Sequence, residues 1–221
     1  RDLVSFSAKT HLGGMFTELQ NRFDIFLVAY FMTPRDVGLY SIALALAEIM
    51  WRLPKVAAAV LLPRLAKEKE QRRSIDITAK LNRVIFALLV PSVVMIGLCV
   101  GWIINLLFGE EFLGAYTATL LLIAGLLFQS LYSITHSDMI MRGQASIFSF
   151  AVFVGLIGMI VGDVALIPVY GIEGAALSST IGWIITGTYV FLNVVRNNKL
   201  TMASYFDARP ELKSLFAMLR G

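Results

Sequence analysis

The chain has 221 residues, of which 57% are hydrophobic and only 15% charged, and its mean hydropathy is +0.75. A soluble domain would be closer to half apolar and about a quarter charged, so this composition indicates a membrane protein. Cys99 is the only cysteine, which excludes an intrachain disulfide and a cysteine-based zinc site. The chain begins at Arg1 without a signal-peptide pattern, and we expect it to be a fragment of a longer protein.

Six apolar stretches are long enough to cross a bilayer, which takes about 20 residues of helix. In chain order they cover residues 11–32, 38–64, 82–107, 114–140, 146–167 and 172–195. Short segments of Gly, Pro and polar residues separate them, so consecutive helices should pack antiparallel. The sequence therefore predicts an all-α integral membrane fold, a six-helix transmembrane bundle over residues 1–196.

Lysine and arginine gather on one side of this predicted bundle. The joint between the second and third spans and the segment after the sixth are rich in them, whereas the opposite joints hold only Arg35. By the positive-inside rule, both ends of the chain are cytoplasmic. Residues 197–221 would form a cytoplasmic tail, in which 207–220 has the spacing of an amphipathic interfacial helix. Topology accounts for the basic residues, and no aromatic residues interleave with them, so we expect no nucleic-acid partner.

The first two spans carry charges near mid-membrane. Counting about 1.5 Å per residue from the middle of each span places five charged residues within roughly 6 Å of the bilayer centre: Arg22, Asp24, Glu48, Arg52 and Lys55. Glu48, Arg52 and Lys55 are spaced i, i+4, i+7 on one helix face, and Glu18 lies four residues before Arg22. A charge at this depth costs at least about 2.5–3.5 kcal/mol. We therefore expect Glu18–Arg22 and Glu48–Arg52 ion pairs, facing a hydrated cavity and not lipid.

Two interpretations of these charges stay open. In the first, they are structural ion pairs that fix helix contacts inside the bundle. In the second, they line a substrate path, because pairing of two acids leaves positive charge over for an anion. Arginine grips phosphate oxygens in a bidentate way, and lysine adds a point charge. No metal site and no cofactor are expected, although Asp24 or Glu48 would suit coupling to H⁺ or Na⁺, with Asp163 a weaker candidate.

Four stretches, in this order, carry a resemblance to a known family: "LQNRFDIFLVAYFMTPRDVGLYSIALALAE", "LLPRLAK", "IINLLFGEEFLGAYTATLLLIAGLLF" and "LIPVYGIEGAALSSTIG". They are similar to the seventh and eighth helices, the ninth-to-tenth connection and the eleventh-to-twelfth turn of oligosaccharide-lipid flippases. These form the polysaccharide-transporter branch of the multidrug/oligosaccharidyl-lipid/polysaccharide (MOP) exporter superfamily. The likeness covers about residues 5–196 and lies in the order and spacing of several motifs.

The resemblance implies twelve helices in two six-helix lobes, of which this chain matches the C-terminal one. It implies three partners: the N-terminal lobe, membrane lipids and a lipid-linked oligosaccharide such as an O-antigen unit. The whole protein would flip this polyprenyl-pyrophosphate-linked sugar across the bacterial inner membrane by alternating access. By position, the residues that would meet the pyrophosphate in the central cavity are Arg22, Arg52 and Lys55, and those that would support them or couple transport are Glu18, Asp24 and Glu48.

Two alternative functions remain. A multidrug or cation exporter of the same superfamily would favour an acidic or aromatic cavity, whereas this one is more basic. A membrane-embedded polysaccharide polymerase would carry a long outer loop with catalytic Arg or His, and the outer joints here are short. The chain also has no Gly-x-Ser-x-Gly elbow and no Gly-rich phosphate loop. We therefore expect a transporter and not an enzyme.

Overall fold

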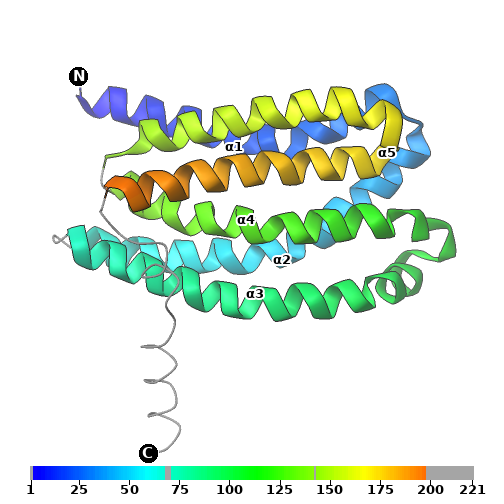
Figure 1. Ribbon diagram of the computed structural model, residues 1–221, viewed down its shortest axis with the longest axis horizontal. Coiled ribbons are helices and arrows are strands. Elements are labelled where there is room, and N and C mark those ends of the chain that lie inside the picture. The colour runs from blue at the N-terminus through cyan, green and yellow to red at the C-terminus, as the bar shows by residue number, and fades with distance from the viewer. Residues whose placement is uncertain (1, 68–70, 142, 198–221) are drawn as a thin grey trace, which may run out of the picture.

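The computed structural model describes residues 2–67, 71–141 and 143–197, and in these ranges the chain is almost entirely helical. The elements are α1 (Asp2–Phe31), α2 (Pro34–Lys67), α3 (Gln71–Phe108), η1 (Glu110–Ala115), α4 (Tyr116–Met141) and α5 (Ala145–Asn197). Successive helices run antiparallel along one long axis (Figure 1). The predicted all-α fold is confirmed. The amphipathic helix predicted over 207–220 lies outside the described residues.

The fifth and sixth predicted spans fall within the single element α5. Its backbone leaves the helical conformation at Gly171 (φ 61°, ψ −136°). Glycine has no Cβ and adopts this positive φ without strain, so the chain turns back on itself there. Figure 1 shows the two halves of α5 running in opposite directions from this turn, which gives the bundle six helical segments.

The start of α2 is fixed by a reciprocal cap. The backbone N–H of Thr33 donates to Asp36 Oδ2 (3.0 Å), and the N–H of Asp36 donates to Thr33 Oγ1 (3.4 Å). Pro34 occupies the first helical position, where its missing N–H costs nothing. The cap therefore ends α1 and reverses the chain within a few residues, so that α1 and α2 run side by side.

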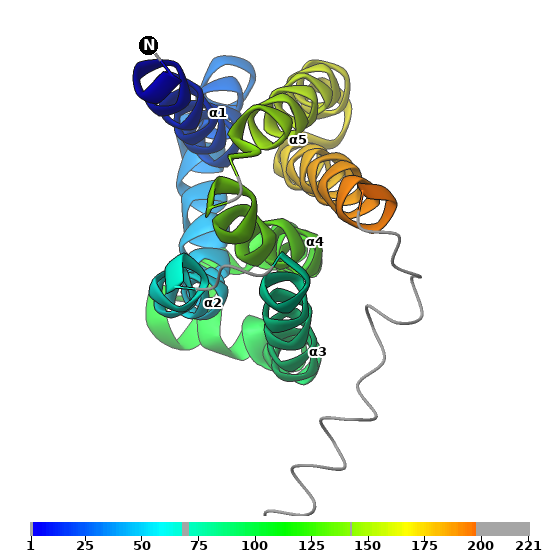
Figure 2. The ribbon, with the colours of Figure 1, turned by 90° about the vertical axis from the view of Figure 1, so that its left-hand side faces the viewer.

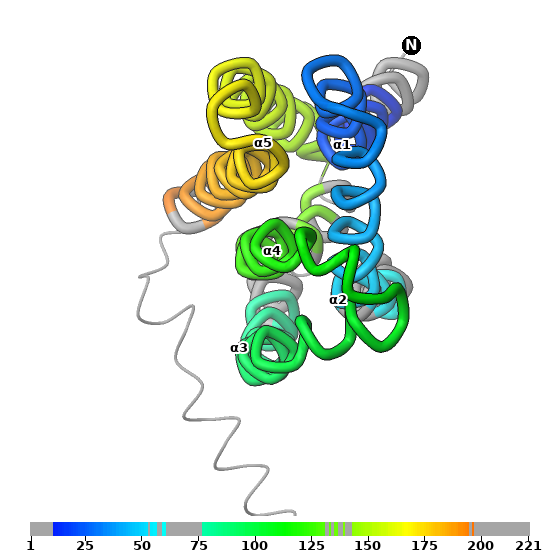
Figure 3. Tube along the Cα trace, turned by 90° about the vertical axis from the view of Figure 1, so that its right-hand side faces the viewer, coloured from blue at the N-terminus to red at the C-terminus, as the bar shows by residue number. Residues whose placement is uncertain are grey.

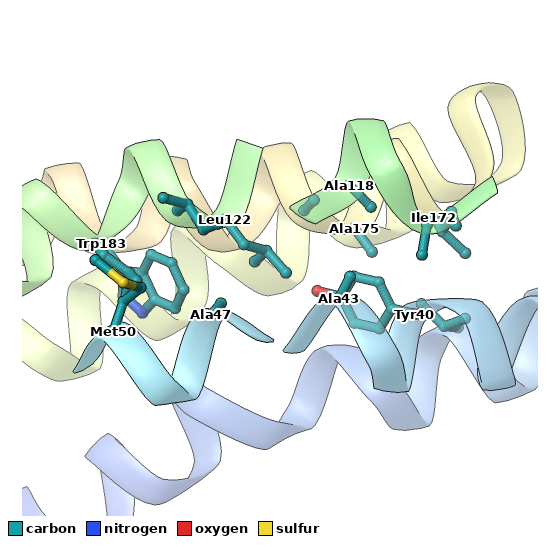
Figure 4. Close-up of a cluster of buried hydrophobic side chains, with 14 of the residues drawn as sticks. Tyr40, Ala43, Ala47, Met50, Ala118, Leu122, Ile172, Ala175 and Trp183 are labelled. Carbon is teal, nitrogen blue, oxygen red and sulfur yellow. The ribbon is translucent and has the colours of Figure 1, made fainter. Parts of the chain in front are cut away.

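Viewed along the helices, α4 lies between the α1–α5 side and the α2–α3 side of the bundle (Figure 2). The opposite view shows the α1–α2 joint, η1 and the turn of α5 at one end (Figure 3). Figure 4 shows how one face of α2 meets α4 and α5 through buried residues: Tyr40, Ala43, Ala47, Met50, Ala118, Leu122, Ile172, Ala175 and Trp183. Small side chains at these contacts let the helices approach closely.

The outer surface of the bundle is apolar. Met95, Leu98 and Trp102 on α3 are 69%, 82% and 68% exposed. Among the described residues, four segments are long and apolar enough to span a membrane: Pro34–Val56, Ile77–Phe108, Glu110–Ser130 and Ala145–Val194. Helix α1 does not join them, because its central turns carry three charged residues. A surface this apolar indicates lipid contact, and the charges of α1 mark a face that lipid does not cover.

Candidate functional site

A pocket between α1 and α2, called the charged pocket below, contains most of the predicted site residues. Its lining comprises Glu18, Asn21, Arg22, Glu48, Trp51, Arg52 and Lys55. These residues come from the central turns of both helices. The sequence therefore identified side chains that the fold brings together, although their roles stay predictions.

The ion pair in the charged pocket joins the two helices, whereas we expected pairs within each helix. Arg22 Nη2 lies 3.4 Å from Glu48 Oε1. Over the described part of the chain, neither Glu18–Arg22 nor Glu48–Arg52 forms an ion pair, so those two predictions are wrong. Spacing along one helix identifies only local neighbours, and α2 offers Arg22 a better-placed carboxylate.

Positive charge is in excess in this pocket. Arg22 and Glu48 offset each other, and Arg52 is exposed. Lys55 Nζ sits 3.5 Å from the centre of the Trp51 ring, a cation–π contact that leaves the net charge unchanged. Three cations therefore face two carboxylates. Because the Arg22 side chain is 66% exposed, water or another protein surface must cover this face inside the membrane.

The structure separates Asp24 from the charged pocket. Its side chain is 1% exposed. Asp24 Oδ2 accepts hydrogen bonds from Tyr40 Oη (2.6 Å) and Ser179 Oγ (2.8 Å), and Oδ1 accepts one from the Ile25 N–H (2.8 Å). We call Asp24, Tyr40 and Ser179 the Asp24 cluster. Residues two apart on a helix do not share a face, so Arg22 and Asp24 point to different neighbours.

Asp163 lies near the Asp24 cluster. It is 0% exposed, and neither of its carboxylate oxygens has a hydrogen-bond partner. Asp163 and Asp24 are close enough to interact electrostatically. The preceding residue, Gly162, packs against the second half of α5 so tightly that a Cβ there would lie 2.9 Å from Ser178 Oγ. A contact between sequentially distant polar residues leaves no local pattern, so the sequence alone did not link Asp163 to Asp24.

An antiparallel helical bundle with an apolar exterior and a charged pocket at mid-depth defines a multi-pass membrane protein. A family model described as "Polysaccharide biosynthesis protein" matches residues 1–117. The chain therefore belongs to the polysaccharide biosynthesis protein family. A search of the curated proteins finds no match.

Two solved structures share the fold. One is a MOP superfamily transporter from Pyrococcus furiosus, described as having a binding pocket of reverse polarity, with 18% identity and a TM-score of 0.71. The other is a multidrug resistance transporter of the MATE family in an outward-facing conformation, with 20% identity and a TM-score of 0.64. Each match covers 96% of this chain and 49% of the other, so the chain spans about half their length. The predicted likeness to MOP transporters is therefore confirmed for the fold.

Proposed function

We propose that this chain is the C-terminal lobe of a transporter that flips polyprenyl-pyrophosphate-linked oligosaccharide across the bacterial inner membrane for cell-surface polysaccharide synthesis. Both of its ends face the cytoplasm in this proposal. An N-terminal six-helix lobe is the second body, against which this lobe rocks to expose the pocket to each side in turn. The family description and the MOP fold support transport, and the charged pocket supports the substrate.

The observation that carries the proposal is the cationic excess of the charged pocket. The Arg22–Glu48 pair leaves Arg52 and Lys55 against the single carboxylate of Glu18. Arg52 offers a planar fork for two phosphate oxygens, and Lys55 offers a compact charge beside it. Glu18 and Glu48 act as supporting residues that keep the cations in place when no substrate is bound.

A mostly apolar face of α1 adds a place for the lipid part of this substrate. It borders the charged pocket at Glu18 and Arg22, and its other lining residues are mostly apolar: His11, Gly14, Met15, Leu19, Phe23 and Phe26. A ligand with an anionic head and an isoprenoid tail matches a cationic pocket that borders an apolar helix face. The continuity favours a lipid-linked phosphate over a free sugar nucleotide.

Export of a multidrug or cationic substrate is the second candidate, because one of the solved relatives is a multidrug transporter. A cationic substrate would need exposed carboxylates. The carboxylate with the most hydrogen bonds here, Asp24, is buried and accepts bonds from Tyr40 and Ser179. The exposed pocket has more cations than acids, which favours an anion. Polymerase activity is the least favoured candidate, because the fold relatives are transporters.

Asp24 is the coupling residue in this proposal, and H⁺ or Na⁺ is the coupling ion. Its burial and its bonds to α2 and α5 mean that binding a cation at Asp24 changes contacts between three helices. Glu48 is less suited, because Arg22 already neutralises it. In proteoliposomes, Asp24→Asn should keep downhill lipid flipping but lose its stimulation by an imposed H⁺ or Na⁺ gradient. If both gradients still stimulate flipping by Asp24→Asn as in the wild type, Asp24 is not the coupling residue.

The substrate is tested by translocation of lipid-linked oligosaccharide in the full-length protein carrying Arg52→Ala. We expect a loss of about tenfold or more, since hydrogen bonds to charged groups contribute about 1.5–3 kcal/mol. Arg52→Lys should restore part of the rate. Arg35→Ala is the matched control, because Arg35 is exposed at the start of α2 and outside the pocket.

The outcomes separate the two interpretations of the charges. Lost transport with a normal amount of folded protein in the membrane supports a substrate-binding Arg52. Normal transport by Arg52→Ala rejects that role. Disappearance of the protein from the membrane supports a structural role for Arg52 instead.

A further inference from the structure

A small pocket, called the inner pocket below, adjoins the charged pocket on the side of α4 and α5. The two pockets share Asn21, Glu48 and Trp51. The free volume of the inner pocket is about 20 Å³, and a cavity needs roughly 10–15 Å³ to hold a water molecule. The inner pocket therefore has room for one water. Its remaining lining consists of Leu44, Ala47, Leu126, Gln129 and Trp183.

Polar atoms of this lining are buried without a hydrogen-bond partner among the described residues. The Gln129 and Trp183 residues are only 1% and 4% exposed, and Figure 4 shows the Trp183 ring close to Ala47 of α2. Buried polar atoms are nearly always paired, and a buried indole N–H usually finds an acceptor. A partner for these atoms must be as small as the space between them. The unpaired atoms are Asn21 Nδ2, Trp51 Nε1, Gln129 Oε1 and Trp183 Nε1.

The hydrogen-bonding capacity of the lining matches that of water. Gln129 Nε2 donates to Asn21 Oδ1 at 2.9 Å, which leaves one N–H donor and one acceptor in this amide pair. Exchanging oxygen and nitrogen in both amides reverses the bond and leaves the same capacity. A water that donates to the amide pair and accepts from the Trp51 and Trp183 indoles makes three hydrogen bonds, the usual number for a buried water. Glu48, on the same lining, offers an acceptor for its second proton.

The neighbouring turn of α1 shows the alternative that the fold uses elsewhere. Gln20 is 0% exposed, and its Nε2 donates to Thr186 Oγ1 at 3.1 Å. The amide on the α5 side of α1 is thus bonded directly to another side chain. The lining of the inner pocket has no such direct partner for its indoles among the described residues, although it is equally well buried.

Trp51 connects the inner pocket with the cations of the charged pocket. Its Nε1 is buried, whereas the face of its ring carries Lys55 Nζ at 3.5 Å from the ring centre. A hydrogen bond at Nε1 fixes the plane of an indole ring, and the plane of the ring sets where a cation can rest on it. Whatever holds Trp51 Nε1 therefore also positions Lys55.

We propose that the inner pocket binds one water molecule, which bridges the Asn21–Gln129 amide pair to the Trp51 and Trp183 indoles. The water joins α1 and α4 to α2 and α5, and it fixes the Trp51 ring under Lys55. Trp51 and the water act as positioning groups for Lys55. This site goes beyond the proposed function and does not depend on which substrate the transporter carries.

The water is tested by a structure of the full-length protein in lipid nanodiscs at about 2 Å resolution. We expect one density peak within about 2.7–3.2 Å of a polar atom of the Asn21–Gln129 pair and of at least one of the two indole nitrogens. A map that shows other buried waters but no peak here would reject the site. Direct hydrogen bonds among the lining side chains in place of the peak would reject it as well. The wild-type protein decides this part without any variant.

The positioning of Lys55 is tested by its rate of acetylation with acetic anhydride, followed by mass spectrometry. Gln129→Met removes the amide to which the water donates. We expect acetylation of Lys55 to become about two- to fivefold faster, because a cation–π contact at an exposed site contributes about 0.5–1 kcal/mol and 1.4 kcal/mol corresponds to tenfold. Gln20→Met is the matched control, since it also removes a buried glutamine, and it should leave the rate unchanged.

A second variant, Trp183→Phe, removes one donor to the water and keeps an aromatic ring. It should change the Lys55 rate in the same direction, and it replaces Gln129→Met if that protein does not fold. If both variants keep the wild-type rate, or if Gln20→Met raises the rate equally, the positioning of Lys55 is rejected and the structure alone decides the water site. Faster acetylation in Gln129→Met and Trp183→Phe alone, with the water peak in the wild type, supports the whole proposal.

Discussion

Two charged residues of α1 lie two positions apart and have opposite surroundings. The Arg22 side chain is 66% exposed and forms a single ion pair of 3.4 Å across to Glu48. Asp24 is buried and accepts three hydrogen bonds, two of them from side chains on α2 and α5. A charged group whose hydrogen bonds are all made within the bundle holds its helices together. A charge left open on an otherwise apolar helix requires a counterpart from outside the described bundle, such as water or another protein surface.

Asp163 lies between these extremes. It is as buried as Asp24, yet its oxygens have no partner. Burying a carboxylate without a hydrogen-bond partner is costly when the group is ionised, so burial favours its protonated form. The contrast among Arg22, Asp24 and Asp163 can be measured through the free energy of unfolding of single variants and through the coupling energy of residue pairs.

The largest effect is expected from Asp24→Ala, which leaves Tyr40 Oη, Ser179 Oγ and the Ile25 N–H without their acceptor. Each buried donor left unpaired costs about 1–3 kcal/mol, and we expect a total loss of about 3 kcal/mol or more. Thermal unfolding of the purified protein in detergent measures it. Asp24→Asn keeps one acceptor oxygen and should lose less. An unchanged melting temperature for Asp24→Ala would contradict a structural role for the Asp24 cluster.

Asp163→Asn should act in the opposite direction. The substitution removes a carboxylate whose oxygens are buried without a hydrogen-bond partner, so we expect a gain of about 1 kcal/mol or more at high pH, where the carboxylate would be ionised, and little change where it is protonated. The same unfolding assay, with Asp24→Asn in parallel, gives the comparison. A fall in melting temperature would show that the lobe already stabilises the Asp163 carboxylate.

Arg22 and Glu48 should be coupled only weakly. Exposed pairs contribute about 0.2–1 kcal/mol in double-mutant cycles, and the 3.4 Å distance is long for a charged hydrogen bond. A cycle of Arg22→Ala, Glu48→Ala and the double variant measures the coupling by unfolding. A coupling of several kcal/mol would mean that the Arg22–Glu48 pair stabilises the fold, as the Asp24 cluster does.

A similarly small effect on stability concerns Lys55 and Trp51. Removing the cation–π contact with Lys55→Met should cost about 0.5–1 kcal/mol or less, because the contact is at an exposed site. Transport should fall by less than in Arg52→Ala, since Lys55 supplies a point charge and no bidentate contact. A larger loss of transport in Lys55→Met than in Arg52→Ala would show that Lys55 contributes more to transport than Arg52.

Much of the fold could be predicted from hydropathy and spacing. Apolar runs indicated the crossings, and short segments of Gly, Pro and polar residues indicated the turns, two of which have the Thr33–Asp36 cap and the positive φ of Gly171. Charges in apolar segments stand out against their surroundings, so six site candidates were found, and five of them line the charged pocket. Asn21 and Gln129 were missed, because uncharged amides in a long span give a much weaker signal.

The sequence by itself determined a membrane-embedded helical bundle, its turns, and the level of its charges along each helix, because these depend on residues close together along the chain. Only the tertiary structure decided the partners: Glu48 for Arg22, Tyr40 and Ser179 for Asp24, and Gln129 for Asn21. Partner choice depends on how helices far apart in sequence face each other. A helix brings every residue within reach of several neighbours, and packing against α2, α4 and α5 selects one of them.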